Sequence, residues 1–355
     1  MLKHCFATIE HSAVGNHGLA INDAMAENGF DLEMYSETIR PEFRNRVIDF
    51  ETFKKDLRSD DVVFYQFANP SPMADLLYER KCRLVLNYHS ITPAYFFDRY
   101  DLHTCEAISR ARTQLARLAP VCSAAVAVSD SNARELIELG YKNVEVIPPV
   151  FSDAFYKAQI TKITRSVPAK FGQSDLNRWL FVGRIAPHKS THKIIEAFDF
   201  YLRNVDSQAK LTLVGKSDVP LYGKKIEKLI ADRNLSDSVE IIENCPLDEL
   251  TEIYTTSSVF VSLSQHEGFG VPLVEAMASG LPIVALRAGA VGDTVSGAGI
   301  LIDSQDPATV AMAVSEVLEN TILKEELINK GLIRAQMFHP EETLKSYVDY
   351  LAKWY

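Results

Sequence analysis

The chain has little cysteine and no closely spaced cysteine pair. Its 355 residues include five cysteines, scattered at positions 5, 82, 105, 122 and 245. Because disulfide frameworks and zinc sites need cysteines at short, regular spacings, this scatter predicts reduced thiols and neither kind of site. The amino-terminal sequence, Met1 to Phe6, also lacks the long apolar core of a signal peptide, so we expect no export.

Long hydrophobic runs and an excess of positive charge are absent as well. No apolar run approaches the ~20 residues that a membrane-spanning helix requires, and the formal net charge is −10. An acidic chain is a poor partner for nucleic acid, which favours a basic surface. We therefore expect a cytoplasmic protein that binds no nucleic acid.

Three arginines leave open a peripheral contact with the inner face of the cell membrane. Arg110, Arg112 and Arg117 lie on a predicted helix over 104–118. They could meet an anionic membrane or a lipid-linked pyrophosphate. Half-solvated charges on a helix are the alternative interpretation, because Glu106 lies nearby.

Short apolar stretches alternate with longer amphipathic ones along the whole chain. This alternation predicts an α/β fold of two doubly wound, mostly parallel sheets, each covered by helices on both faces. Ligands of such sheets bind at the carboxyl ends of the strands, so we expect a ligand cleft between the two domains. The predicted strands are 2–9, 31–35, 61–65, 84–88, 124–128 and 144–147, then 179–183, 210–214, 239–242, 259–263, 282–286 and 299–302.

The domain boundaries follow from breaks in this pattern. Residues 1–157 form the predicted amino-terminal domain, and 179–339 form the second. Between them, 158–178 is polar and weakly periodic, which is typical of a connection. The last segment, about 340–355, has a helical pattern with several aromatic residues.

The stretch 266–280 has the pattern of a turn that leads from a buried strand into a helix. Pro272 suits the first helical turn and Gly280 the helix end. The unpaired N–H groups at such a helix start attract an anion, and the carboxylates of Glu267 and Glu275 accept hydrogen bonds from hydroxyls. The combination suits a nucleotide-sugar. An ordinary βα turn with a helical cap is the alternative.

A basic loop follows the first strand of the second domain. Arg184 and Lys189 are expected at the carboxyl end of that strand, where a guanidinium and an ammonium together suit a diphosphate. A solvated basic loop is the alternative interpretation. His188 and His192 have the i, i+4 spacing of a metal pair, but no acidic residue accompanies them, which favours a capping or loop role.

Taken together, these motifs resemble those of the retaining GT-B glycosyltransferases of family 4. The resemblance covers about 179–318 throughout, and includes Leu213-Val214-Gly215 and Glu249-Leu250 with Tyr254. The amino half is similar in plan, and its sequences Asn87-Tyr88-His89-Ser90-Ile91-Thr92-Pro93 and Arg112-Thr113-Gln114-Leu115 resemble a branch of bacterial surface-polysaccharide enzymes. The resemblance implies a GT-B fold, whose carboxyl-terminal helix returns to the amino-terminal domain.

The resemblance also implies roles for individual residues. Glu267 would hold the transferred sugar, Glu275 the ribose, and His89 would reach the sugar from across the cleft. Gly15 and Gly18 would form the amino-terminal glycine loop, although their spacing departs from the adjacent glycines of the family. The implied catalytic residues are Glu267, Arg184, Lys189 and His89. The implied donor-binding residues are Arg184, Lys189, Leu247, Gly268, Phe269, Gly270, Val271 and Glu275.

The function implied is retaining transfer of a hexose from a nucleotide-sugar to a polysaccharide or a lipid-linked oligosaccharide. We expect UDP-glucose as donor, with a GDP-mannose-dependent mannosyltransferase as the alternative. No cofactor or metal is expected, because Arg184, Lys189 and the helix start supply positive charge. A nucleotide-sugar epimerase and a noncatalytic sugar-nucleotide-binding subunit are further alternatives. A nicotinamide dehydrogenase is disfavoured, since no G-x-G-x-x-G follows the first strand.

Overall fold

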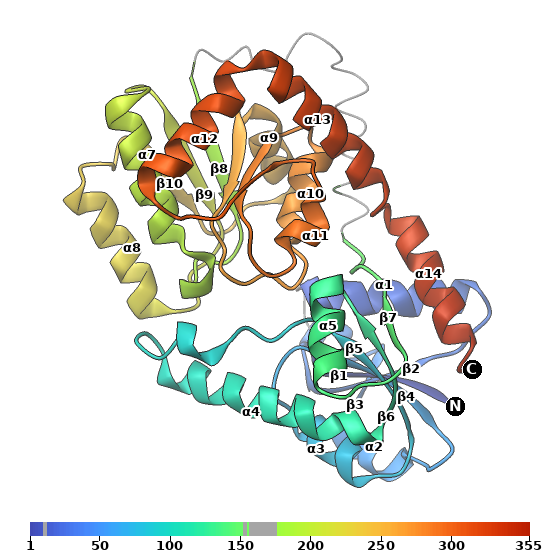
Figure 1. Cartoon of the computed structure of the whole chain (residues 1–355). Coiled ribbons are helices and arrows are strands. Elements are labelled where there is room, and N and C mark those ends of the chain that lie inside the picture. The colour runs from blue at the N-terminus through green and yellow to red at the C-terminus, as the bar shows by residue number, and fades with distance from the viewer. Residues whose placement is uncertain (10–12, 152–154, 156–175) are drawn as a thin grey trace. The chain divides into compact units, whose positions relative to one another are not determined.

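The structure, a computed structural model, describes residues 1–9, 13–151, 155 and 176–355 (Figure 1). Contacts divide these residues into two units. The first contains the described residues of 1–95 together with 102–151 and 340–355, and the second contains 96–101, 155 and 176–339. Most of the predicted connection, 158–178, lies outside the described residues, and its boundaries stay predictions.

The first unit is built on a sheet of seven strands in the order β3-β2-β1-β4-β5-β6-β7, in which every pair is parallel. The strand β4 is buried at every residue, as expected for a sheet covered on both faces. The strands are β1 Leu2–Ile9, β2 Glu33–Ile39, β3 Val47–Asp49, β4 Val62–Phe67, β5 Arg83–Tyr88, β6 Cys122–Ala127 and β7 Val144–Val146. The helices are α1 Ala13–Glu27, α2 Phe50–Asp56, α3 Pro72–Glu79, α4 Leu102–Leu118, α5 Asp130–Glu138 and α14 Pro340–Ala352.

The second unit has a parallel sheet of six strands in the order β10-β9-β8-β11-β12-β13. Strand order therefore reverses between β8 and β11, which is where open α/β sheets form their ligand crevice. The strands are β8 Arg178–Val182, β9 Lys210–Val214, β10 Val239–Ile242, β11 Val259–Ser262, β12 Ile283–Leu286 and β13 Ile300–Ile302. The helices are α7 Thr191–Asn204, α8 Pro220–Asp232, α9 Leu247–Thr256, α10 Val271–Ala278, α11 Val291–Val295, α12 Pro307–Glu319 and α13 Thr321–Gln336.

The carboxyl-terminal helix α14 belongs to the first unit, where it packs against α1 (Figure 1). Tyr347 of α14 is fully buried, and its hydroxyl donates to the backbone oxygen of Ile147 at 3.1 Å. The predicted return of this helix to the amino-terminal half is confirmed.

The predicted glycine loop at Gly15 and Gly18 is wrong as a loop. Both glycines lie inside α1, which begins at Ala13. The structure gives Gly18 a packing role, because a Cβ at this position would overlap the ring of the buried Phe6 in β1. A glycine here lets the helix approach the strand closely, which the sequence pattern alone does not distinguish from a flexible loop.

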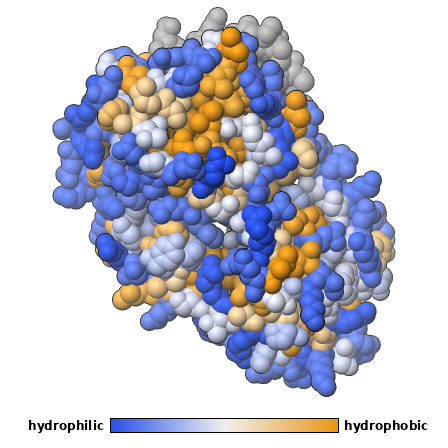
Figure 2. Space-filling view, in the orientation of Figure 1, coloured by the Kyte–Doolittle hydropathy of each residue, from blue (hydrophilic) through white to orange (hydrophobic). Residues whose placement is uncertain are grey.

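No helix among the described residues is long and apolar enough to cross a membrane. Hydrophobic residues do reach the surface, interspersed with hydrophilic ones on the face shown in Figure 2. Exposed apolar residues of this kind are common on folded proteins, whose polar groups cannot cover the whole surface.

We expect Gly18→Ala to lower the free energy of unfolding by about 1–3 kcal/mol, because the new methyl group overpacks the contact with Phe6. Urea unfolding followed by circular dichroism measures the change. Gly292→Ala is the matched control, since this glycine of α11 has no atom within 4 Å of the added Cβ. Equal destabilisation of the two variants would contradict the packing role of Gly18.

Candidate functional site

An ion pair joins two loops at the point where the strand order of the second unit reverses. Lys189 closes the short 3-10 helix Pro187–Lys189 after β8, and Glu267 lies in the loop after β11. Lys189 Nζ donates to Glu267 Oε1 at 2.6 Å, and the two side chains are only 17% and 12% exposed. Gln265 supports the same contact, since its backbone N–H donates to His188 O and its side chain to Ser190 Oγ. The structure thus brings Lys189 and Glu267 together.

Arg184 follows β8 as predicted, but it pairs with a carboxylate other than Glu267. Its Nε lies 3.2 Å from Oδ2 of Asp218, in the loop after β9, and the side chain is 57% exposed. An exposed pair of this kind is held weakly. The guanidinium therefore lies at the carboxyl end of the sheet, held by a contact that an anion can replace.

His188 and His192 lie against aromatic side chains. His188 is buried and packs on Phe96 and Phe97, and burial lowers its pKa well below the ordinary value. The charges of Lys189 and Arg184 lower it further. His192 Nδ1 lies 2.8 Å from the hydroxyl of Tyr222, and burial lowers the pKa of His192 to about 4. Among the described residues, no cluster of acidic, histidine or cysteine side chains could hold a metal ion.

The loop between Glu267 and α10 is held by close backbone contacts. Gly270 has a φ of +90°, and a Cβ there would lie 2.7 Å from Leu273 Cδ1. Gly289 passes so close to Glu267 that a Cβ added at Gly289 would lie 2.6 Å from the backbone oxygen of Glu267. Thr294 Oγ1 donates to Phe269 O at 2.5 Å. The helix α10 thus starts at a fixed position, and the positive end of a helix dipole attracts an anion.

Glu275 lies in α10, one helical turn beyond this start. Its Oε2 accepts a hydrogen bond of 2.8 Å from the hydroxyl of Tyr254, a buried residue of α9. Burial raises the pKa of Glu275 to about 7, and the hydrogen bond from Tyr254 opposes that rise. Leu247, the predicted contact for the base, is the first residue of α9 and is 40% exposed. Glu275 is therefore a carboxyl group held in place and close to its protonation midpoint at neutral pH.

His89 lies in the first unit, directly after β5. Its Nε2 is 2.6 Å from the side-chain amide of Gln66, its ring is 5.0 Å from that of His17, and burial lowers its pKa to about 4. A neutral imidazole at this position can offer one donor and one acceptor. Its predicted position across the cleft remains a prediction.

The arginines of α4 are paired with carboxylates. Arg112 donates to Glu135 at 2.9 Å and to the backbone oxygen of Ile91 at 2.6 Å. Arg110 and Arg117 lie 2.7 and 3.6 Å from the carboxylate of Asp75. These pairs favour the interpretation of surface helix charges, and membrane contact stays a proposal.

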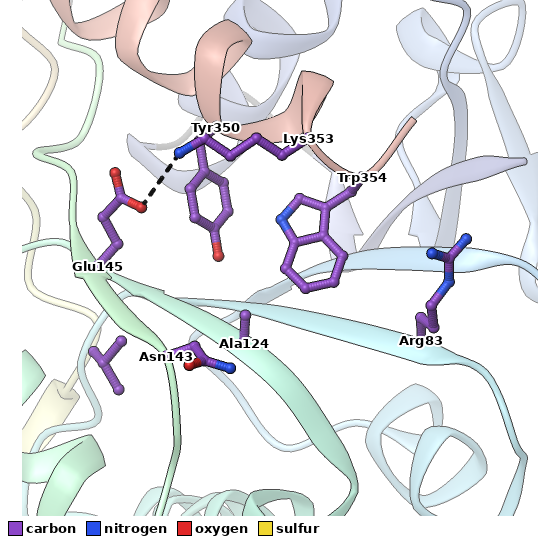
Figure 3. Close-up of a pocket in the computed structure, with 8 residues that line it drawn as sticks. Arg83, Ala124, Asn143, Glu145, Tyr350, Lys353 and Trp354 are labelled. Carbon is purple, nitrogen blue, oxygen red and sulfur yellow. Dashed lines mark ion pairs between the residues drawn. The ribbon is translucent and has the colours of Figure 1, made fainter.

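A pocket of about 440 Å³ lies apart from these residues, in the first unit (Figure 3). It is formed between the first residues of β5 and β7 and the end of α14, and is lined by Arg83, Ala124, Asn143, Val144, Glu145, Tyr350, Lys353 and Trp354. Doubly wound sheets bind ligands at the carboxyl ends of their strands. This pocket lies at the opposite ends, so we do not assign the site to it.

The family of the second unit follows from comparison with known proteins. The model of the group 1 glycosyl transferases matches residues 165–333. This part of the chain belongs to that family. The resemblance seen in the sequence is thereby confirmed, and both site loops lie within the group 1 domain.

The curated relatives are matched over part of their length. A D-inositol 3-phosphate glycosyltransferase of Acidothermus cellulolyticus is 31% identical over 47% of this chain and 38% of its own. The O-antigen chain mannosyltransferase B of Escherichia coli is 24% identical over 47% of this chain and 45% of its own. The chain thus spans less than half the length of these relatives.

The solved structures show the fold over the whole chain. Anabaena HepE in complex with UDP-glucose superposes with a TM-score of 0.75, covers 99% of both chains and is 17% identical. WaaG, a glycosyltransferase of lipopolysaccharide biosynthesis, has a TM-score of 0.71 over 99% of both chains and is 13% identical. The predicted GT-B fold of two Rossmann-like sheets is confirmed.

Three further residues support the predicted ones, and the sequence assigned no role to any of them. Tyr254 holds Glu275, Asp218 pairs with Arg184, and Gln265 joins the two loops. Tyr254 had a signal, because it belongs with Glu249-Leu250 to the motifs that carry the resemblance. Asp218 and Gln265 lie in loops without a pattern, and only the folded chain reveals their partners.

The high pKa of Glu275 makes stability depend on pH. The unfolded carboxyl ionises near 4.5 and the folded one near 7, so the folded state binds more protons between these values. We expect the free energy of unfolding to fall by about 3 kcal/mol as pH rises through this window. In Glu275→Gln this fall should be lost, whereas Glu252→Gln, an exposed change on α9, should keep it. Urea unfolding at pH 5 and pH 8 measures both. Identical pH profiles in the wild type and Glu275→Gln would contradict the assignment.

Proposed function

We propose that the protein is a retaining glycosyltransferase that moves a hexose from a nucleotide-sugar to a polysaccharide or a lipid-linked oligosaccharide. The observation that carries the proposal is the Lys189–Glu267 pair at the switch point of the second sheet, beside the start of α10. It offers a cation and helix N–H groups to a diphosphate, and a carboxylate to sugar hydroxyls. The group 1 family of this domain supports the same reading.

In this proposal the two basic residues bind the leaving nucleotide. Lys189 keeps one N–H on Glu267 and turns its other two toward the donor diphosphate, since an ammonium has three donors. Arg184 exchanges Asp218 for a phosphate oxygen and can bind it with two parallel hydrogen bonds. Both charges stabilise the negative charge that builds on the diphosphate as it leaves.

The remaining residues hold the donor on either side of the diphosphate. Glu267 accepts hydrogen bonds from the transferred sugar and Glu275 from the ribose, while His89 meets the sugar from the first unit. The backbone at Leu247 contacts the base. The helix start presents the amides of Gly268, Phe269, Gly270 and Val271.

Transfer then proceeds with retention of configuration. The bond between the sugar carbon and the diphosphate oxygen breaks, and the acceptor hydroxyl attacks from the same face. Its oxygen forms the new glycosidic bond, and its proton passes to the leaving phosphate. Because Arg184, Lys189 and α10 supply positive charge, we propose that no metal ion is required.

The donor is proposed to be UDP-glucose. The support is the fold shared with HepE, which was solved with UDP-glucose, and GDP-mannose remains the second candidate because of the O-antigen mannosyltransferases among the relatives. We propose a cytoplasmic enzyme whose acceptor is a surface-polysaccharide precursor. We also propose that the enzyme contacts the membrane peripherally.

We expect Arg184→Ala to lower the rate of sugar transfer at least tenfold, because the diphosphate loses a charged hydrogen-bond donor. The rate is measured as the transfer of labelled sugar from the nucleotide-sugar to an added acceptor or, without acceptor, to water. Arg203→Ala is the control, since this exposed arginine at the end of α7 pairs with Asp199. The assigned role of Arg184 fails if its variant turns over like the wild type.

A thermal-shift screen against UDP-glucose, GDP-mannose and their free nucleotides tests the donor. We expect the largest rise in melting temperature with UDP-glucose, unchanged by EDTA, because binding to the folded state alone stabilises it. A larger rise with GDP-mannose would replace the proposed donor. Binding without transfer or hydrolysis would favour the noncatalytic subunit, and isomerisation of the free donor would favour the epimerase.

A further inference from the structure

A chain of buried polar side chains in the first unit ends at His89. It runs from His17 of α1 through Asn87 of β5 and Gln66 of β4, which are register partners on adjacent strands. His17 Nε2 lies 3.0 Å from the Asn87 amide, that amide lies 2.9 Å from the Gln66 amide, and Gln66 lies 2.6 Å from His89 Nε2. His17, Asn87 and Gln66 are all at most 2% exposed. We call these four side chains the His89 relay.

One end of the His89 relay is fixed by the backbone. The N–H of Val150 donates to His17 Nδ1 at 2.9 Å. A backbone amide can only donate, so His17 Nδ1 carries no proton. Burial lowers the pKa of His17 well below its ordinary value, and the ring is therefore neutral. Its single proton must be on Nε2.

This proton determines the orientation of the two amides that follow. His17 Nε2–H needs an acceptor, so Asn87 turns its oxygen toward His17. The same oxygen faces Gln66, which must therefore present its nitrogen. The opposite orientation, with Asn87 Nδ2 toward His17, would make both ring nitrogens acceptors, which a neutral imidazole cannot be. Rotating an amide by 180° exchanges its nitrogen and oxygen and keeps every contact distance.

The orientation of the Gln66 amide then determines which nitrogen of His89 carries the proton. The Gln66 nitrogen has two hydrogens, of which one goes to Asn87 and the other to His89 Nε2. His89 Nε2 is thus an acceptor, and the neutral ring carries its proton on Nδ1. On the far side, the Gln66 amide lies 2.7 Å from His4 Nε2. In this orientation, the amide oxygen faces His4 and accepts the proton on Nε2. Each of the three histidine rings is thereby assigned one proton.

We propose that the backbone N–H of Val150, acting through His17, Asn87 and Gln66, fixes His89 in the tautomer that carries its proton on Nδ1. His17, Asn87 and Gln66 are then positioning residues for His89. The consequence for catalysis rests on the proposed function: a sugar hydroxyl that meets Nδ1 meets a hydrogen-bond donor. The tautomer itself is independent of that function.

The nitrogen-15 NMR spectrum of the full chain with labelled histidine tests the tautomer without substrate. His89→Gln assigns the signals, because those missing in this variant belong to His89. We expect Nε2 of His89 in the range of unprotonated nitrogen and Nδ1 in the range of protonated nitrogen. The reverse pattern overturns the proposal.

Two substitutions that replace an amide by a carboxylate test the orientation of the amides in the His89 relay. In Gln66→Glu the carboxylate can only accept, so we expect the proton of His89 to move to Nε2. In Asn87→Asp the carboxylate keeps the oxygen that His17 and Gln66 use, so His89 should stay protonated on Nδ1. A switch in Asn87→Asp, or its absence in folded Gln66→Glu, contradicts the proposal. If Gln66→Glu does not fold, the wild-type spectrum still decides.

Kinetics separate this proposal from the proposed function. We expect Gln66→Glu and His89→Gln each to lower kcat/KM for sugar transfer about tenfold, the size of one lost hydrogen bond. Wild-type turnover by His89→Gln, together with the expected spectrum, would remove His89 from the sugar site and leave the tautomer standing. If the spectrum is reversed but the rate falls as expected, His89 stays in the sugar site and the proposed tautomer is wrong.

Discussion

The partly buried pair of Lys189 and Glu267 is the contact on which the proposed donor site depends. Each charge would be costly alone at its level of burial, because removing one partner of such a pair leaves the other without compensation. The loops after β8 and β11 therefore hold each other in place. Gln265 and Gly289 fit the same junction, one by bridging the loops and the other by its close approach to Glu267.

Burial acts in opposite directions on the acids and the bases of the chain, and in both cases it removes charge. Glu275 stays partly protonated near neutral pH, whereas His89 and His17 stay neutral. Hydrogen bonds then determine what each neutral group offers, as Tyr254 does for Glu275. In the proposed function, neutral groups of this kind would offer hydrogen bonds of fixed direction to sugar hydroxyls, while the full charges of Lys189 and Arg184 would serve the phosphates.

Most of the fold could be predicted from the sequence, because buried parallel strands are continuous apolar runs such as Val62–Phe67 and Val259–Ser262. The strand β3 and the helix α2 were missed, since three and seven residues are too few to show a period. Gly15 and Gly18 were misplaced because a glycine needed for close packing looks like one needed for a turn. The loops of the site followed from strand ends, but the contacts of Arg184 with Asp218 and of Gln265 with Ser190 join segments that no local pattern connects.

The place of α14 affects the order in which the chain can fold during synthesis. Tyr347, Tyr350 and Leu351 belong to the same buried cluster as Leu2, Ile21 and Val62 near the start of the chain. The amino-terminal half therefore leaves the ribosome first but lacks part of its core until the last helix has emerged. The second unit, whose sheet lies within 178–302, can complete its hydrogen-bonded strands earlier. Until then the nascent first unit exposes the apolar surface that α14 later covers, and such surface is prone to aggregation.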